Sequence, residues 1–309
     1  MSHQNKKTLE LQAVERLQGL LRYGHSKHED KRQGIAGQYI YSYSTAKAYT
    51  KHCLYFAKWG KHSERIRAEL GHRPRTLAEL QPYAADWIRE REQAGLSAYT
   101  LKLEVSALAK LFGGPLDLQT KGTRRAEITR SRGAAKRDKH FSEAANAELV
   151  NFCRCVGCRR SELAKMRAED LRQTAAGPAV WIRGKGGRER VAPIVGDPEE
   201  IRRALAFLAN LDGRQRVHSA ADIHSYRADY AKRIYTLYAK DPADLRGRID
   251  YTAITGKTRN GARIWKSAVY ICRGDQAGTV FDRAAMLQAS RALGHDREGV
   301  VGEHYLYKC

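Results

Sequence analysis

Residues 179–194 read AVWIRGKGGRERVAPI, with an apolar run on each side of a glycine-rich segment. Valine, isoleucine and tryptophan are typical of strands, and closely spaced glycines allow a chain to reverse its direction. We therefore predict two strands joined by a turn, with Lys185 at its tip. The flanking segments have helical periodicity, so the sequence predicts a mostly α-helical fold with a small β-sheet.

On the N-terminal side of this hairpin, apolar residues recur at helical spacing. Each such segment begins at a serine or threonine and most end at a glycine, which are signals for helix starts and stops. The predicted helical segments are residues 8–24, 44–61, 76–95 and 97–113. Short helices that follow one another in this way predict a compact all-α module.

On the C-terminal side, the predicted elements are mixed. We predict two helices within residues 142–171, broken at Gly157, and a further helix over residues 219–239. Residues 267–281 have the pattern of a second hairpin, and a helix capped by Asp282 follows it. With the central hairpin, these elements predict a mixed α/β second domain.

The sequence is strongly basic: 56 Lys and Arg residues against 34 Asp and Glu give a formal net charge of +22. Such an excess repels itself unless a polyanion neutralises it, and the composition favours nucleic acid as that polyanion. Residues 121–140 have the composition of a linker and hold eight Lys or Arg against two acids. The linker residues that we expect to contact DNA are Arg124, Arg125, Arg130, Arg132, Lys136 and Arg137.

Several other classes of function lack their motifs in this sequence. The Gly-Lys pairs at 184–185 and 256–257 lack the glycine or the hydroxyl residue that a phosphate-binding loop requires. The cysteines at 153, 155 and 158 lack the paired C-x-x-C spacing of structural zinc sites, so we expect no metal site. There is no long apolar run and no signal peptide, so we expect a cytoplasmic protein without membrane contact.

Two arginines are placed where a guanidinium group can bind a phosphate. In the motif GCRRSEL, Arg159 lies at a predicted helix start, and Glu162 lies three residues on, where it can orient the guanidinium. In the motif HSYR, His224 and Arg227 are three residues apart and therefore share one helical face. Arginines suit this task because their planar donors match the nonbridging phosphate oxygens.

Three further side chains would complete a phosphodiester chemistry. Lys185 at the hairpin tip can protonate a leaving oxygen, and His295, which follows a Leu-Gly pair, can share protons. Tyr305 lies four residues from the C-terminus, and a tyrosine hydroxyl becomes a nucleophile when a base and cationic surroundings activate it. This set requires neither a metal nor another cofactor.

The ordered motifs GCRRSEL, RGKGGRERVAPI, HSYR, LGH and HYL resemble those of the tyrosine recombinase, or phage integrase, family. The resemblance extends from Ser42 to Tyr307, and the helical segment that ends in SAYTLKLEVSALAKLF is similar to that family's core-binding domain. It implies a SAM-like helical core-binding domain followed by a mixed α/β catalytic domain. The implied parts are an N-terminal helical extension, the core-binding domain, a basic linker and the catalytic domain, at residues 1–40, 41–116, 117–139 and 140–309.

The resemblance implies a site-specific DNA recombinase, an integrase of a mobile element, that cuts and rejoins double-stranded DNA through a 3′-phosphotyrosyl intermediate. The catalytic residues that it implies are Arg159, Lys185, His224, Arg227, His295 and Tyr305, with Glu162 as a supporting acid. Tyr305 would be the nucleophile, His224 the acceptor of its proton, and Lys185 the acid for the 5′-oxygen. The family also implies a homo-oligomer, a tetramer on two DNA sites, and a directionality factor as a candidate further partner.

The sequence departs from the family pattern in its spacing. From Arg227 to His295 is 68 positions, which implies an insertion at about 235–275 that would contact DNA, contact a neighbouring subunit or serve neither role. The gap from His295 to Tyr305 is one residue longer than usual, so Tyr307 is an alternative nucleophile. The tail is too short for the C-terminal helix that many relatives pass to a neighbour.

Two alternative functions share this scaffold. One is a resolvase-like or topoisomerase-like enzyme with the same chemistry. The other is a catalytically inactive DNA-binding regulator, which would not require the full set of catalytic residue types that this sequence contains.

Overall fold

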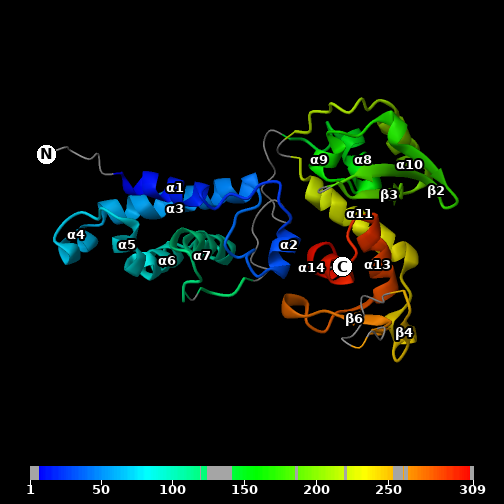
Figure 1. Cartoon of the computed structure of the whole chain (residues 1–309). Helices are drawn as coiled ribbons and strands as arrows, with labels where there is room; N and C mark the ends of the chain where they lie inside the picture. The colour runs from blue at the N-terminus through cyan, green and yellow to red at the C-terminus, as the bar shows by residue number, and fades with distance from the viewer. Residues whose placement is uncertain are drawn as a thin grey trace. The chain divides into compact units, whose positions relative to one another are not determined.

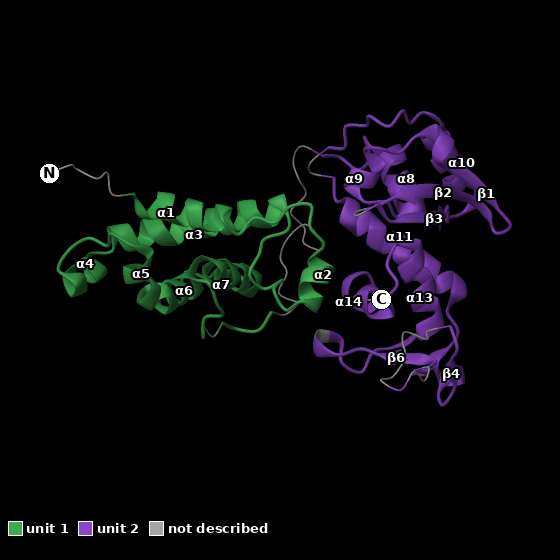
Figure 2. Cartoon of the chain, viewed as in Figure 1, with its two compact units in different colours: residues 1–127 green, residues 128–309 purple. Residues whose placement is uncertain are grey.

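The computed structural model describes residues 7–118, 120–123, 141–184, 187–218, 221–252, 260 and 264–306. The chain divides into two compact units, residues 1–127 and 128–309, which Figure 2 shows in different colours. The predicted fold class is confirmed, because helices predominate and the strands form small antiparallel sheets. Within the described segments, each helix is too short or too polar to cross a membrane.

The described part of unit 1 is built from helices (Figure 1). They are α1 (Leu9–Gln18), α2 (Lys27–Arg32), α3 (Tyr43–His62), α4 (Glu64–Leu70), α5 (Leu77–Leu80), the 3-10 turn η1 (Gln81–Tyr83), α6 (Ala84–Gln93) and α7 (Ala98–Phe112). Helices α1, α3 and α7 begin after Thr8, Ser42 and Ser97, whose side-chain oxygens accept hydrogen bonds from the first-turn backbone. Helix α3 packs against both α1 and α7.

The helices predicted over residues 8–24, 44–61 and 97–113 are confirmed, although α1 ends early at Gln18. The segment 76–95 forms α5, η1 and α6 instead of one helix. Pro82 lies at this division, and proline interrupts a helix because it lacks an N–H and its ring clashes with the preceding turn. Helices α2 and α4 lie outside the predicted segments.

The core of unit 1 contains a fully buried acid. Glu104 on α7 accepts hydrogen bonds from Arg91 Nη2 on α6 at 2.9 Å and lies 3.0 Å from His52 Nδ1 on α3. A buried carboxylate is costly without such partners. The three side chains therefore fix α3, α6 and α7 in one arrangement. Helix α1 packs Leu9 and Leu17 into the same core.

Unit 2 combines helices with short strands. Its elements are α8 (Ala147–Val156), α9 (Arg160–Leu163), η3 (Ala168–Asp170), β1 (Leu171–Thr174), β2 (Gly177–Arg183), β3 (Glu189–Pro193), α10 (Pro198–Ala209), α11 (Ile223–Tyr238), α12 (Pro242–Leu245), β4 (Ile249–Asp250), β5 (Lys266–Ser267), β6 (Val269–Ile271), η5 (Gly274–Gln276), β7 (Val280–Asp282), α13 (Arg283–Ala292) and α14 (Glu298–His304). Within its described residues, β1, β2 and β3 form an antiparallel sheet in that order, while β4 pairs with β5 and β6 with β7.

The hairpin predicted over residues 179–194 is confirmed as β2 and β3, with Trp181 opposite Val191. Strand β1, which was not predicted, pairs with β2 and forms an edge of the sheet. The hairpin predicted over 267–281 is confirmed as β6 and β7. The second helix predicted within 142–171 is only one turn long, because α9 ends at Leu163 and the chain then turns into η3 and β1.

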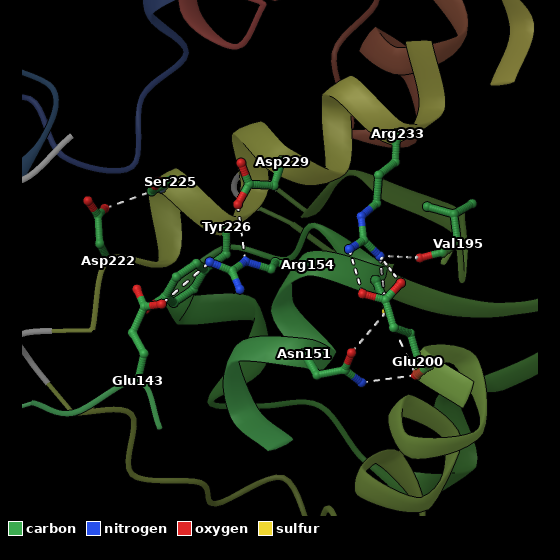
Figure 3. A network of polar contacts seen from close by, with 11 residues as sticks. Glu143, Asn151, Arg154, Val195, Glu200, Asp222, Ser225, Tyr226, Asp229 and Arg233 are labelled. Atoms are coloured by element: carbon green, nitrogen blue, oxygen red, sulfur yellow. Dashed lines mark hydrogen bonds and ion pairs between the residues drawn. The ribbon is translucent and has the colours of Figure 1, made fainter. Parts of the chain in front are cut away.

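Helix α11 lies between the two hydrophobic cores of unit 2 and contributes to both. Ile223 and Tyr226 pack with α8 and α10, whereas Tyr230 and Ile234 pack with α13 and α14. A polar network also fixes α11, as Figure 3 shows. In that network Arg233 Nη1 and Nη2 donate to both oxygens of Glu200 at 2.7 Å, and Arg154 on α8 donates to Asp229.

Gly157, at the end of α8, occupies a position that only glycine fits. Its φ is +63°, and a Cβ atom built there would lie 2.1 Å from Cδ1 of the buried Tyr230 ring. The Gly157→Ala substitution is therefore expected to lower the free energy of unfolding by about 3 kcal/mol, through backbone strain and overpacking. The midpoint of urea unfolding measures this loss.

Gly247 is the matched control for this substitution. Its φ is +77°, but among the described residues no atom lies within 4 Å of a Cβ built there. Gly247→Ala should therefore cost only the backbone strain, about 1 kcal/mol. Equal losses for Gly157→Ala and Gly247→Ala would show that the contact with Tyr230 has no energetic importance.

Candidate active site

Arg159 is positioned by the turn between α8 and α9. The chain reverses at Gly157, and Arg159 has the extended backbone (φ −81°, ψ 158°) of a residue that precedes a helix. Its backbone N–H donates to Glu162 Oε2 at 2.7 Å, and its Nη1 donates to Glu162 Oε1. The guanidinium is thereby fixed on one side, while the side chain keeps 29% exposure on the other.

Glu162 is shared between two arginines. Arg190 on β3 donates from Nη1 to Glu162 Oε1 at 3.0 Å and from Nη2 to Oε2 at 2.8 Å. Its Nε donates to the Ala292 carbonyl at 3.0 Å, at the end of α13. The Arg190 side chain is 7% exposed and that of Glu162 only 2%. Arg190 therefore connects α9, β3 and the segment that leads to His295.

Glu162 remains ionised in this environment. Burial alone would raise the pKa of its carboxyl group, but the hydrogen bonds and charges of Arg190 and Arg159 outweigh burial and lower the pKa to about 2. The stabilisation that depends on this carboxylate is present above its ordinary pKa of 4.5 and is lost as the pH falls toward 2. At neutral pH Glu162 is a fixed negative charge between two guanidinium groups.

Arg227 on α11 is almost completely buried, at 1% exposure. Its Nη1 donates to the Gly157 carbonyl and its Nη2 to the Leu293 carbonyl, so it links the turn before α9 to the end of α13. Its Nε donates to the Tyr305 hydroxyl oxygen at 3.3 Å. The guanidinium also lies over the Tyr305 ring, 5.7 Å from the ring centroid. Arg227 thus places a positive charge beside the tyrosine oxygen.

Tyr305 follows α14 directly and lies near the rings of two histidines, His224 and His295. The centroid of the His224 ring, from the first turn of α11, lies 5.2 Å from the Tyr305 centroid, and that of His295 lies at 6.2 Å. His295 Nε2 lies 3.4 Å from Arg159 Nη2. Only 7% of Tyr305 is exposed. The structure therefore brings the motif residues from α9, α11, α13 and α14 into one site.

The site has an excess of positive charge. Of its described residues, Arg159, Arg190 and Arg227 carry guanidinium groups, whereas Glu162 carries the one carboxylate. An anionic group such as a phosphodiester would reduce this imbalance.

A pocket of about 420 Å³ lies beside these residues. Its walls include Arg159, Arg190 and His295 of the site, together with Arg188 from the hairpin and Arg291 from α13. Acidic side chains, Glu189 and Asp296, also line it. The pocket leaves space next to Arg159.

His295 is expected to make the protein less stable as the pH falls from about 7 to about 4.5. Burial, followed by the charges of Arg227, Arg159 and Arg190, lowers the pKa of His295 from 6.5 to about 4. Between these values the unfolded chain binds a proton that the folded chain does not, so unfolding becomes easier as the pH decreases. Denaturant midpoints across this range should therefore fall less steeply for His295→Gln than for the unmodified protein. Identical pH profiles would contradict this role.

Several residues expected in the site lie outside the described residues. They are Lys185, which falls between β2 and β3 in the sequence, Tyr307, and the linker residues Arg124, Arg125, Arg130, Arg132, Lys136 and Arg137. Their expected roles stay predictions. Gly184, next to Lys185, is described, and a Cβ atom there would lie 3.0 Å from Glu162 Oε1, so the hairpin end approaches the site closely.

Arg190 is the residue of this site that the sequence interpretation missed. One local signal was available: strand side chains alternate between faces, and Ala192 and Ile194 are buried. This alternation places Arg190 on the same inward face, where an arginine requires a buried acid. Its partner Glu162 is 28 positions away in the sequence, so no local pattern identifies it.

The clustered cysteines belong to a hydrophobic core. Cys153, Cys155 and Cys158 are buried with Phe152 and Leu163. Burial raises the pKa of Cys155 to about 11. Among the described residues, no three His, Cys, Asp or Glu side chains gather in a way that could hold a metal ion.

No protein-family model and no curated protein matches this sequence. Among solved structures, the chain is similar to the XerH site-specific recombinase bound to palindromic difH substrate in a post-cleavage complex, with 12% identity, a TM-score of 0.48, and coverage of 99% of this chain and 96% of that chain. A pre-cleavage complex of XerH gives 12% identity, a TM-score of 0.45, and coverage of 97% and 93%. The Tn1549 transposon integrase in complex with circular intermediate DNA gives 11% identity, a TM-score of 0.41, and coverage of 96% of both chains. At this level of similarity, only the residues of the site itself can support a function.

Proposed function

We propose that this protein is a site-specific DNA recombinase of the tyrosine recombinase family, acting as the integrase of a mobile element. The observation that carries the proposal is the environment of Tyr305. Its hydroxyl oxygen lies 3.3 Å from Arg227 Nε, its ring lies beside those of His224 and His295, and Arg159 is next to His295. A tyrosine in a cationic site with nearby bases has the surroundings that activate it as a nucleophile.

In the proposed reaction, Arg159 and His295 bind the nonbridging oxygens of one DNA phosphodiester. Arg159 is held for this task by Glu162, and His295 acts as a neutral hydrogen-bonding group because its pKa is lowered to about 4. Arg227 stabilises the negative charge that develops on the Tyr305 oxygen and on the phosphate. These interactions strengthen as charge develops, so they favour the transition state over the bound DNA.

The covalent step is a transesterification. The Tyr305 oxygen attacks phosphorus, its proton passes to His224, the bond from phosphorus to the 5′-oxygen breaks, and Lys185 protonates that oxygen. The products are a 3′-phosphotyrosyl protein and a free 5′-hydroxyl. A 5′-hydroxyl from another strand reverses the step, so one phosphodiester replaces another and no ATP is consumed.

The proposed partner is double-stranded DNA. The net charge of +22 supports this partner, and the basic residues of the linker would contact phosphates, which position the protein without reading sequence. Unit 1 would serve as the core-binding domain and unit 2 as the catalytic domain. Assembly as a tetramer on two DNA sites and control by a directionality factor are further parts of the proposal.

The test is formation of a covalent adduct. The protein is incubated with nicked duplexes that carry candidate sites from the DNA flanking its own gene, so that cleavage releases a short strand and religation cannot occur. A denaturing gel is expected to show a protein–DNA adduct. DNA binding without any adduct on all of these duplexes would instead support the catalytically inactive regulator.

A further inference from the structure

The inserted segment between Arg227 and His295 packs against α14, the helix that precedes Tyr305. The insertion at about 235–275 contains β4, β5 and β6, β7 follows it, and helix α14 ends immediately before Tyr305. Strand β6 and the adjoining residue Cys272 contribute to the same hydrophobic core as α13, Val301 and Tyr305. The segment is therefore part of the structure around the candidate nucleophile.

Tyr270 of β6 lies against α14. A Cβ atom built at Gly299 would lie 3.2 Å from the Tyr270 hydroxyl oxygen, and one built at Gly302 would lie 3.5 Å from Tyr270 Cε1. The ring thus lies directly on the backbone of α14, along a face where both residues are glycine. Met286 of α13 would lie 2.9 Å from the same atom at Gly302. Helix α14 therefore packs against both α13 and residues of β6.

A buried acid fixes the beginning of α14 to the same strands. Glu298, at 3% exposure, forms an ion pair with Lys266 of β5 and accepts a hydrogen bond from Arg283 Nη1 at 2.8 Å. Arg283 also donates to the carbonyls of Ser267 and Val269, and its guanidinium lies 5.2 Å from the centroid of the Tyr270 ring. Arg283 therefore connects Glu298 of α14, the backbone of β5 and β6, and Tyr270.

We propose that residues 266–282, with Tyr270 and Lys266 as the contacts, form a positioning platform that holds α14 and thereby sets the place of Tyr305 from within the same chain. Tyr305 follows Gly302 by only three residues, so a shift of α14 is passed directly to the hydroxyl group. A displacement of about 1 Å is enough to reduce a reaction rate about 100-fold. The expected effect on the rate of DNA cleavage rests on the proposed function, whereas the positioning of α14 does not.

The strands that precede α13 contact α14 from within the same chain, through Tyr270 and Lys266. Tyr270 and Lys266 lie outside the group that would touch the scissile phosphate, so they act through α14 and are positioning residues.

The first experiment compares Tyr270→Ala with Ile271→Ala in the full-length protein. Ile271 is the next residue of β6, and it is 60% exposed, so its truncation controls for a general change in the strand. Hydrogen–deuterium exchange of residues 298–306 is measured without DNA. We expect faster exchange of this segment in Tyr270→Ala than in Ile271→Ala, at temperatures where both proteins are folded. Equal exchange in the two variants would overturn the platform, whether or not the protein cuts DNA.

The second readout is adduct formation on nicked duplexes at saturating DNA. Tyr270→Ala and Glu298→Gln are expected to slow the adduct by at least about tenfold, while DNA affinity stays within about twofold. Tyr270→Phe retains the ring and should restore most of the rate, which distinguishes positioning from general destabilisation. An unchanged rate in Tyr270→Ala would overturn the catalytic consequence. Absence of any adduct from the unmodified protein would overturn the proposed function alone, because the exchange measurement does not depend on cleavage.

Discussion

The Tyr305→Phe variant is expected to form no covalent adduct with DNA. The substitution removes only the hydroxyl group, whose oxygen accepts a hydrogen bond from Arg227 Nε, and leaves the ring near His224 and His295. The fold and the affinity for DNA should therefore be retained. Removal of a catalytic nucleophile reduces rates by about 10⁴-fold or more, which is below detection on a denaturing gel of nicked duplexes.

The parallel Tyr307→Phe variant is the control for this result, because the sequence offers Tyr307 as an alternative nucleophile. It should form the adduct at nearly the rate of the unmodified protein. An adduct that persists in Tyr305→Phe and disappears in Tyr307→Phe would transfer the nucleophile to Tyr307. Loss of the adduct in both variants, with DNA binding retained, would mean that the cluster around Tyr305 does not by itself define the reacting group.

The second large effect is expected from Arg190→Met. Methionine fills much of the same space but leaves the buried Glu162 carboxylate with Arg159 as its hydrogen-bonding partner and Arg227 Nη1 4.0 Å away. Removing one member of a buried ion pair costs about 3 kcal/mol in the free energy of unfolding, because the other charge is left in a poorly solvated position. Adduct formation should decrease as well, since Glu162, which holds Arg159, is then no longer fixed by Arg190. Denaturant unfolding and the gel assay measure the two effects separately.

Arg233→Met is the matched control for Arg190→Met. Arg233 binds both oxygens of Glu200 in the same bidentate way, but the two side chains are 30% and 28% exposed, so water can solvate the remaining charge. Its loss should cost about 1 kcal/mol or less and should leave the adduct rate unchanged. Equal destabilisation by the two variants would contradict the importance of burial at Glu162.

A double variant tests the charge itself. Glu162→Gln combined with Arg190→Met removes the carboxylate together with its partner, so the folded protein no longer holds a buried charge with too few partners. The double variant should therefore be more stable than Arg190→Met alone, although it should remain impaired in adduct formation. If the two are equally unstable, the loss comes from packing around Arg190 and not from the Glu162 charge.

Much of the fold was predictable because its signals are local. Helices α1, α7 and α13 begin after Thr8, Ser97 and Asp282, whose side chains cap them, and such a signal depends only on residues within one turn. The glycine-rich turn of the β2–β3 hairpin is local in the same sense. The spacing of Arg159 and Glu162, three residues apart in GCRRSEL, indicated their contact for the same reason.

The sequence by itself therefore determined the helical character of unit 1, the two hairpins of unit 2 and the identity of the motif residues. The tertiary structure decided which distant residues meet: Arg159 lies beside His295 across 136 positions, and Arg190 pairs with Glu162 and with the Ala292 carbonyl across 28 and 102. It also decided that the inserted strands carry Tyr270 onto α14. The physical reason is that a buried charge or a close ring contact depends on which surfaces pack together, and packing is set by the whole chain instead of by neighbours in sequence.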